Sequence, residues 1–218
     1  MMKNRNLTRA GVLALLAAVL IVLVLFVDVA PIGPEGTSVG LSRLNQAVHE
    51  GVGVHLFWYK VTQALGYLSI LVAGVFALIG LVQLIRRKSL MKVDAEILAL
   101  GALFIVVIGL YVLFEIVVVN YRPVVMPGDA HPEASFPSSH TMLVCAVLGG
   151  VMMLLPKYVR SAGLRTALSV LCAVLICVMV VGRLLSGVHW FTDIVGGLLI
   201  SGALLSLFAG YLAAGAER

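Results

Sequence analysis

Long apolar stretches separated by short polar segments make up most of this 218-residue chain. A helix that crosses a bilayer needs about 20 mostly apolar residues, and six stretches reach or approach that length. Hydrophobic residues make up 61% of the chain and charged residues 11%, and the mean hydropathy is +1.12. These values exclude an ordinary soluble domain and predict an all-α integral membrane bundle of six transmembrane helices, a single domain over residues 1–218. The predicted spans are Ala10–Val29, Val61–Ile85, Val93–Val119, Ser138–Leu155, Thr166–Val181 and Trp190–Leu212.

The basic residues between these stretches predict how the bundle is oriented. Short cytoplasmic loops of membrane proteins carry an excess of Lys and Arg. With six spans, the N-terminus and the loops after the second and fourth spans lie on one side, and they hold most cations. We therefore expect cytoplasmic termini, and connections 30–60, 120–137 and 182–189 on the extracytoplasmic side. The formal charge of +5 thus reflects membrane topology, and no nucleic-acid partner is predicted. The clustered cations are Lys3, Arg5, Arg9, Arg86, Arg87, Lys88, Lys92, Lys157, Arg160 and Arg165.

The 30–60 connection has the pattern of an interfacial helix. Leu41, Leu44 and Val48 recur at helical spacing among polar residues, and the aromatic run Phe57–Tyr59 follows them. Such a helix rests on the lipid headgroups with its apolar face down and is anchored by aromatic rings. The alternative is that it acts as a lid or lateral gate for a lipid substrate.

Ionisable side chains gather at the outer ends of spans three to six. Charged groups at membrane depth are costly and often functional. These residues come from segments far apart in the sequence but lie at one predicted level. Two guanidinium groups, two imidazoles and carboxylates at the same depth indicate an anionic substrate handled by acid–base chemistry. The residues are Glu115, Arg122, His140, Arg183, His189 and Asp193.

The spacing of four of these residues suits phosphoryl transfer. His189 and Asp193 are four residues apart on a predicted helix and share a face, so the carboxylate can orient the imidazole as a nucleophile. Arg122 and Arg183 have the forked geometry that binds phosphoryl oxygens. Taken singly, the arginines are explained by snorkelling to the interface, and the His–Asp pair by helix stabilisation. Their conjunction at one depth favours an active site.

The start of the fourth span adds a second element of this site. Ser138 is a predicted N-cap, and the unpaired backbone N–H groups of a helix start attract phosphate. His140 lies within the first turn after Pro137, so it is expected to face the same anion. Cys145, Cys172 and Cys177 lie in apolar stretches without metal-ligand spacing, so no metal site is predicted.

Three motifs in register resemble the signature of the type 2 phosphatidic acid phosphatase (PAP2) superfamily. That signature reads K-x6-R-P, P-S-G-H and S-R-x5-H-x3-D. It is matched here by Arg122-Pro123, Pro137-Ser138-Ser139-His140, and Arg183 with His189 and Asp193. The order, the internal spacings and the placement at the outer ends of spans three to six all agree with that pattern.

The resemblance implies a membrane-embedded phosphatase that uses a phosphohistidine and needs no metal or other cofactor. His189 would be the nucleophile, Asp193 would orient it, and His140 would protonate the leaving oxygen. The phosphoryl group would be held by Arg122, Arg183, Ser138 and Ser139. The implied substrates are phospholipid or polyprenyl phosphates, such as undecaprenyl diphosphate, phosphatidylglycerophosphate and phosphatidate. The implied location is a bacterial inner membrane, with the active site on the extracytoplasmic side.

Three residues depart from the family pattern. Ser139 replaces a glycine, Gly182 replaces the serine before Arg183, and Glu115 stands where the family has a phosphate-binding lysine. A carboxylate cannot bind phosphate as a cation does. We expect Glu115 to share a helix face with Arg122 and to hold either Arg122 or Arg183 in place. The alternative is that Glu115 contacts a substrate hydroxyl.

Two other functions remain compatible with the sequence. The scaffold could act as a phosphotransferase that moves a phosphoryl or head group to an alcohol bound by Glu115. It could also be a non-catalytic lipid-binding or transport protein. The presence of His140, His189 and Asp193 together argues against the non-catalytic alternative.

Overall fold

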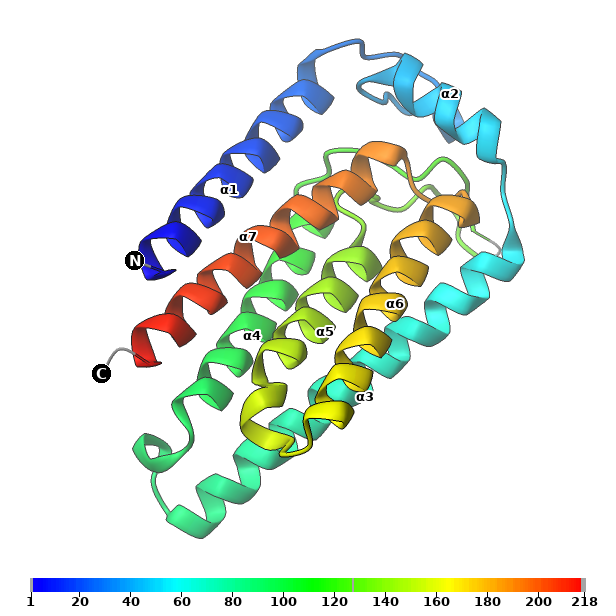
Figure 1. Ribbon diagram of the computed structural model, residues 1–218. Helices are drawn as coiled ribbons and strands as arrows, with labels where there is room; N and C mark the ends of the chain where they lie inside the picture. Colours follow the sequence, from blue (N-terminus) through cyan, green and yellow to red (C-terminus); the bar gives the residue numbers. More distant parts are fainter. Residues whose placement is uncertain (1, 127, 217–218) are drawn as a thin grey trace.

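A computed structural model describes residues 2–126 and 128–216 of the chain and consists of helices joined by loops (Figure 1). Six of the helices in the described residues are long and apolar enough to cross a membrane, which confirms the predicted all-α transmembrane fold. The helices are α1 (Met2–Phe26), η1 (Pro34–Gly36), α2 (Ser42–Val52), α3 (Leu56–Arg87), η2 (Leu90–Lys92), α4 (Ala95–Ile116), α5 (Ser139–Tyr158), α6 (Ala162–Ser186) and α7 (Phe191–Ala216).

Several helices extend beyond their apolar stretches. α3 starts at Leu56 rather than Val61, and α6 runs from Ala162 to Ser186 rather than from Thr166 to Val181. Hydropathy locates only the part of a helix that lies in hydrocarbon. The backbone continues its hydrogen bonding into the interface, where polar side chains are tolerated. These extra turns carry Trp58 and Arg183 toward one end of the bundle.

α5 is the central helix of the bundle and packs against α3, α4, α6 and α7. Its side chains Met142, Val144 and Val147 are almost fully buried among these neighbours. α1 lies alongside α7 at the edge of the bundle (Figure 1). The N-terminal end of α5 is thus surrounded by the ends of α3, α4, α6 and α7.

α2 is the predicted outer helix between the first and second spans. Ser42 and Asn45 are buried against the bundle, whereas Leu44 is 45% exposed. A polar stripe, not the apolar one, therefore faces the protein. This happens because α2 packs on the N-terminal end of α7, which offers polar groups as partners.

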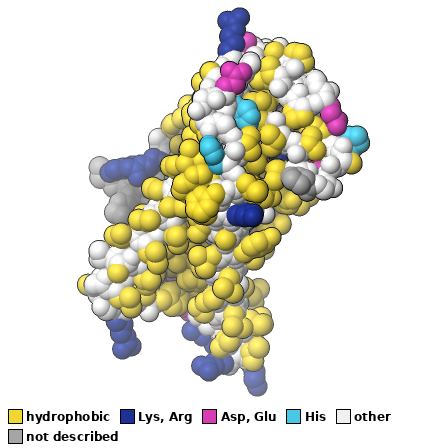
Figure 2. Space-filling view, turned by 90° about the vertical axis from the view of Figure 1, so that its right-hand side faces the viewer, with side chains coloured by type: hydrophobic (Ala, Val, Ile, Leu, Met, Phe, Trp, Pro, Cys, Tyr) yellow, Lys and Arg dark blue, Asp and Glu magenta, His cyan; other side chains and the backbone are white. Residues whose placement is uncertain are grey.

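A cluster of ion pairs joins α3, α4 and α5 at the end of the bundle opposite the start of α5. Asp94 accepts from Arg87 at 2.8 Å and lies 3.3 Å from Lys157, which also pairs with Glu96 at 2.7 Å. The hydrogen bond from Arg87 lowers the pKa of Asp94 to about 2. Figure 2 shows Lys and Arg side chains projecting from this lower end, a broad hydrophobic surface above it, and His and acidic side chains at the upper end.

Candidate active site

The structure brings the predicted site residues together at the end of the bundle where α5 and α7 begin. His140 is in the first turn of α5, and Arg183 is in the last turn of α6. His189 lies in the loop that follows α6, and Asp193 lies in the first turn of α7. Arg122 comes from the loop between α4 and α5. The residues that sequence placed at one depth thus form one cluster, except that Glu115 lies at its margin.

Arg183 is the centre of this cluster. Its side chain is 0% exposed, and its Nη2 lies 3.1 Å from Nδ1 of His140 and 3.3 Å from Nε2 of His189. A guanidinium group can only donate hydrogen bonds, so both imidazole nitrogens must accept. The proton of neutral His140 is therefore on Nε2, and the proton of neutral His189 is on Nδ1.

His189 and Asp193 form the pair that their spacing predicts. Nδ1 of His189 lies 3.5 Å from Oδ2 of Asp193, and both side chains are buried. Oδ2 also accepts the backbone N–H of Trp190 at 2.9 Å. Burial, with the nearby Arg183 guanidinium, lowers the pKa of His189 well below its usual range. The imidazole is therefore neutral at pH 7, with Nδ1–H toward the carboxylate and the Nε2 lone pair toward the cluster centre.

The start of α5 supplies backbone donors, but Ser138 does not cap the helix with its side chain. Its Oγ instead accepts from the hydroxyl of Thr141 at 3.0 Å, and its backbone N–H donates to the carbonyl of Asp193 at 2.9 Å. Ser138 is thus at the predicted N-cap position of α5, but its side chain makes no capping hydrogen bond. Across the described part of the chain, the N–H groups of Ser139 and His140 find no acceptor, as expected for an anion-binding helix start.

The expectation that Glu115 shares a helix face with Arg122 is wrong. α4 ends at Ile116, so Arg122 lies in the following loop and not two turns along the helix. There Arg122 pairs with Glu133 at 3.1 Å, and its backbone N–H donates to the carbonyl of Glu133. No ion pair of Glu115 occurs within the described residues. Arg122 and Glu115 nevertheless line one small recess together with Ser139 and His189.

Donors of both arginines are left without partners. In the part of the chain that the structure describes, the Nε atoms of Arg122 and Arg183 are buried and have no hydrogen-bond acceptor. Buried guanidinium donors without acceptors are destabilising. An anion with several oxygens would pair with them, so the cluster has the chemistry of a phosphoryl-binding site.

Two residues of α3 complete the site and were not predicted. Thr62 accepts from Nη1 of Arg183 at 3.3 Å, and a Cβ on Gly66 would come within 2.8 Å of the His140 ring. A Cβ on Gly182 would likewise come within 2.8 Å of the Thr62 side chain. The serine that the family pattern has at Gly182 thus has no room here, and Thr62 supplies a hydroxyl beside Arg183. No sequence signal linked α3 to this site, because Thr62 and Arg183 are 121 residues apart.

Asn45 of α2 holds the start of α7. Its Oδ1 accepts the backbone N–H of Thr192 at 3.2 Å, and its Nδ2 donates to the Thr192 hydroxyl at 3.0 Å and to the carbonyl of Gly40 at 2.8 Å. The ring of His49, also on α2, lies 5.4 Å from the ring of Trp190. These contacts flank His189 and Asp193, so α2 braces the loop that carries His189 and the start of α7 that carries Asp193.

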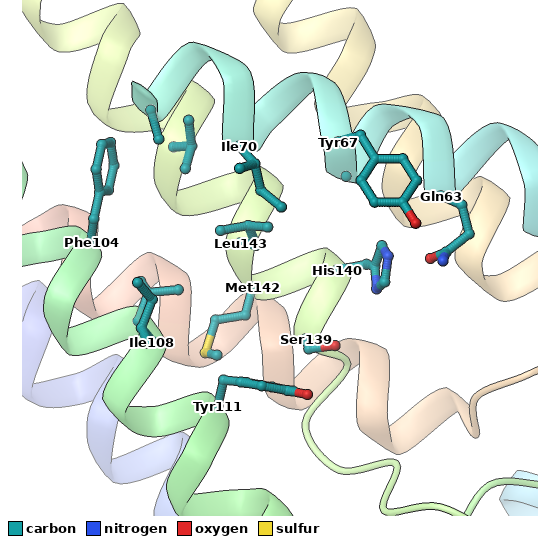
Figure 3. A pocket seen from close by; sticks show the side chains of 14 residues that line it. Gln63, Tyr67, Ile70, Phe104, Ile108, Tyr111, Ser139, His140, Met142 and Leu143 are labelled. Atoms are coloured by element: carbon teal, nitrogen blue, oxygen red, sulfur yellow. The ribbon is translucent and has the colours of Figure 1, made fainter. Parts of the chain in front are cut away.

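An open apolar pocket adjoins this cluster (Figure 3). It lies between α3, α4 and α5, has a volume of about 460 Å³, and falls in the usual range of ligand pockets. Ser139 and His140 line one end, and Ile70, Phe104 and Leu143 line the apolar part. Within residues 2–126 and 128–216, no group of three or more His, Cys, Asp and Glu side chains is arranged to hold a metal ion.

Comparisons with known proteins agree with this architecture. The crystal structure of a transmembrane PAP2 type phosphatidylglycerolphosphate phosphatase from Bacillus subtilis superposes with a TM-score of 0.62 at 19% sequence identity, covering 96% of this chain and 98% of that one. None of the curated proteins matches the sequence. The family model of the PAP2 superfamily matches residues 64–214, from α3 to α7. With the histidines, arginines and aspartate of its three motifs gathered in one cluster, this chain belongs to the PAP2 superfamily.

Proposed function

We propose that this protein is a lipid phosphate or diphosphate phosphatase that works through a phosphohistidine. The observation that carries the proposal is the buried Arg183, whose Nη2 contacts both imidazoles while its Nε lacks an acceptor. A phosphoryl group bound there would lie between two histidines at the end of an apolar cavity. The phosphatidylglycerolphosphate phosphatase from Bacillus subtilis has the same fold, which is consistent with a lipid substrate.

The arrangement supports a two-step reaction. In the first step, Nε2 of His189 attacks phosphorus, the bond from phosphorus to the lipid oxygen breaks, and His140 donates a proton to that oxygen. The bound phosphoryl group accepts the hydrogen bonds that Arg183 otherwise donates to the two imidazoles, so both histidines become free to react. The negative charge of the phosphoryl group stabilises the protonated form of His140. In the second step, water attacks the phosphohistidine, His140 takes its proton, and phosphate leaves. Asp193 holds the His189 tautomer and stabilises its positive charge.

Phosphate release from a panel of lipids tests this proposal. The purified protein in detergent micelles is expected to release inorganic phosphate from at least one phosphatidate, phosphatidylglycerophosphate or polyprenyl diphosphate. No release from any of them would overturn the proposal, provided that the protein keeps its helical circular dichroism.

We further propose that the protein is in a bacterial inner membrane with cytoplasmic termini. The cluster of Arg87, Lys92, Lys157 and Arg160 lies at the end of the bundle opposite the site. The positive-inside rule then puts the site at the extracytoplasmic surface.

A phosphotransferase on the same scaffold is the second candidate. Glu115 lines the recess beside His189 without an ion pair among the described residues, so its carboxylate is available to accept from an acceptor alcohol. The phosphohistidine would then be attacked by that alcohol in place of water. Adding glycerol or a longer alcohol and analysing the products distinguishes the two: transfer yields a new phosphate ester, whereas hydrolysis yields only inorganic phosphate.

Removing the negative charge of the recess is expected to strengthen phosphate binding. Glu115→Lys adds a cation beside Arg122, so KM for a lipid phosphate is expected to fall about threefold to tenfold at low salt. The gain should shrink as salt rises, because exposed charges are screened. Glu50→Lys on the exposed side of α2 makes the same charge change elsewhere and serves as the control. A higher KM in Glu115→Lys, with Glu50→Lys unchanged, would mean that Glu115 itself binds substrate.

The bonds of Asn45 to Thr192 are expected to matter for turnover. Asn45→Ala removes both bonds to the start of α7, so kcat is expected to fall about tenfold to a hundredfold through misalignment of His189, while KM stays within about twofold. Asn45→Asp keeps an acceptor for the Thr192 N–H and should recover part of the loss. Gln46→Ala, whose side chain bonds only to the exposed Glu50, is the matched control. An unchanged kcat in Asn45→Ala would show that α2 does not position the site.

A further inference from the structure

Two segments of the loop between α4 and α5 pair with each other and pack on the start of α7. The backbone N–H of Ser135 donates to the carbonyl of Asn120 at 2.9 Å, next to an antiparallel bridge between Tyr121 and Ala134. Nε1 of Trp190, the residue before α7, donates to the carbonyl of Tyr121 at 2.7 Å. The paired segments are therefore fixed beside the α6–α7 loop and the first turn of α7.

The side chains of Asn120 and Ser135 lie next to the carboxyl group of Asp193. They are 1% and 3% exposed, and Asp193 is 0% exposed. The carboxyl group is within reach of both the Asn120 carboxamide and the Ser135 hydroxyl. Asn120 falls at an undefined position of the first motif, and Ser135 precedes the second motif. The motifs therefore assign no role to either residue.

The two oxygens of the Asp193 carboxyl group have different surroundings. Oδ2 accepts the backbone N–H of Trp190 at 2.9 Å and lies 3.5 Å from Nδ1 of His189. Within residues 2–126 and 128–216, Oδ1 is buried without a hydrogen-bond partner, and so are the Asn120 carboxamide and the Ser135 hydroxyl. Buried polar atoms are seldom left unpaired. Small rotations of the two side chains would direct one N–H and one O–H toward Oδ1.

Donors on Oδ1 matter because the charge of His189 changes during the proposed reaction. The neutral imidazole becomes positively charged when its Nε2 bonds to phosphorus, and Asp193 stabilises that charge only as an ionised carboxylate. Burying an ionised carboxylate is costly unless it is hydrogen-bonded. Hydrogen bonds to a charged acceptor are about twice as strong as neutral ones. Donors on Oδ1 thus favour the ionised form and leave Oδ2 for His189.

We propose that Asn120 and Ser135 are positioning residues, which donate to Oδ1 of Asp193 and so keep its carboxylate ionised and directed at His189. The inference rests on the proposed phosphohistidine reaction. Ser135 lines the recess that also contains Arg122, but its hydroxyl oxygen is buried. Both side chains therefore act through Asp193 and not on the substrate, so they affect kcat and not KM.

A double-mutant cycle with Asp193→Asn tests the proposal on phosphatidate in detergent micelles. Asn120→Leu is expected to lower kcat about tenfold to a hundredfold, and Ser135→Ala about threefold to tenfold, because a donor to a charged group is lost. KM should stay within about twofold. In the Asp193→Asn background both substitutions should change kcat by less than about twofold, because the carboxylate is gone. Ser201→Ala on α7 removes a buried hydroxyl that donates to the carbonyl of Leu198 and is the control.

The Nδ1 proton of His189 provides a measurement that does not depend on turnover. In 15N-histidine-labelled wild-type protein its resonance is expected downfield, as for an imidazole that donates to a carboxylate. In Asn120→Leu it should move upfield, toward its position in Asp193→Asn. A resonance that does not move in Asn120→Leu would overturn the inference.

The kinetic outcomes separate this inference from the proposed function. Equal losses of kcat in the wild-type and Asp193→Asn backgrounds would mean that Asn120 and Ser135 support folding only, and would overturn the inference alone. A raised KM in Ser135→Ala would also overturn it, because the hydroxyl would then bind substrate. No phosphate release by the wild-type protein from any lipid of the panel would overturn the proposed function and this inference together.

Discussion

Replacing His189 with alanine is expected to abolish phosphate release, by at least about a thousandfold, without unfolding the protein. Nε2 of His189 is the protein atom proposed to bond to phosphorus, and its position in the α6–α7 loop, outside the membrane-spanning helices, limits the effect on packing. Asp193→Asn should keep partial activity, because the amide disturbs the tautomer but leaves the attacking atom. Steady-state phosphate release, with thermal unfolding measured in parallel, checks both variants.

The covalent intermediate provides an independent measurement. Wild-type protein quenched during turnover of a 32P-labelled lipid phosphate should carry label that is stable in alkali and lost in acid, as a phosphoramidate is. His189→Ala should carry none, and His140→Ala should still label with a slow release step. Acid-stable label, or label in His189→Ala, would contradict the phosphohistidine.

The pH dependence follows from the environment of His189. Burial and Arg183 lower the pKa of His189, so the nucleophile remains unprotonated at pH values below the usual histidine range. The acid limb of kcat/KM that belongs to His189 is therefore expected well below pH 6.5. A limb near pH 6.5 would mean that His189 is solvated in the free protein.

The sequence was sufficient to locate the membrane spans and to identify the motif residues, because both depend on local patterns. A bilayer imposes a minimum apolar length, and His189 and Asp193 are only four residues apart in the sequence. The helix end at Ile116 was not predictable in this way. The apolar run continues through Val117, Val118 and Val119, and no glycine or proline marks the break. The position of Arg122 and its partner Glu133 were missed as a result.

The other site residues that the sequence did not predict depend on contacts between helices that are far apart in the sequence. In the sequence, Asn45 looks like an ordinary polar residue of an amphipathic helix. In the structure it is buried and hydrogen-bonded to Thr192, 147 residues away. Thr62 and Gly66 lie in a helix that the motifs do not include. Their roles depend on how α3 packs against α5 and α6, which hydropathy and local spacing do not encode.

Substitution of Arg183 is expected to lower activity strongly, as substitution of the nucleophile His189 does. Arg183→Lys keeps the positive charge but replaces a planar fork with a single ammonium. One ammonium cannot bond both imidazoles and Thr62 with the same geometry and still receive a phosphoryl group. The loss of two charge-assisted hydrogen bonds, each worth about 1.5–3 kcal/mol, predicts a fall in kcat/KM of at least about a hundredfold. Arg160→Lys, exposed at the opposite end of the bundle, is the control.

The tautomers of His140 and His189 show whether Arg183 acts by hydrogen bonding to both imidazoles or only through its positive charge. Because Arg183 only donates, 15N spectra of histidine-labelled wild-type protein should show His140 with its proton on Nε2 and His189 with its proton on Nδ1. In Arg183→Lys at least one imidazole should become a mixture of tautomers, because the fixed donor opposite it is gone. If both tautomers persist while activity falls, the guanidinium acts on the phosphoryl group alone. If activity persists with both tautomers scrambled, the bridge observed between His140 and His189 has no part in turnover.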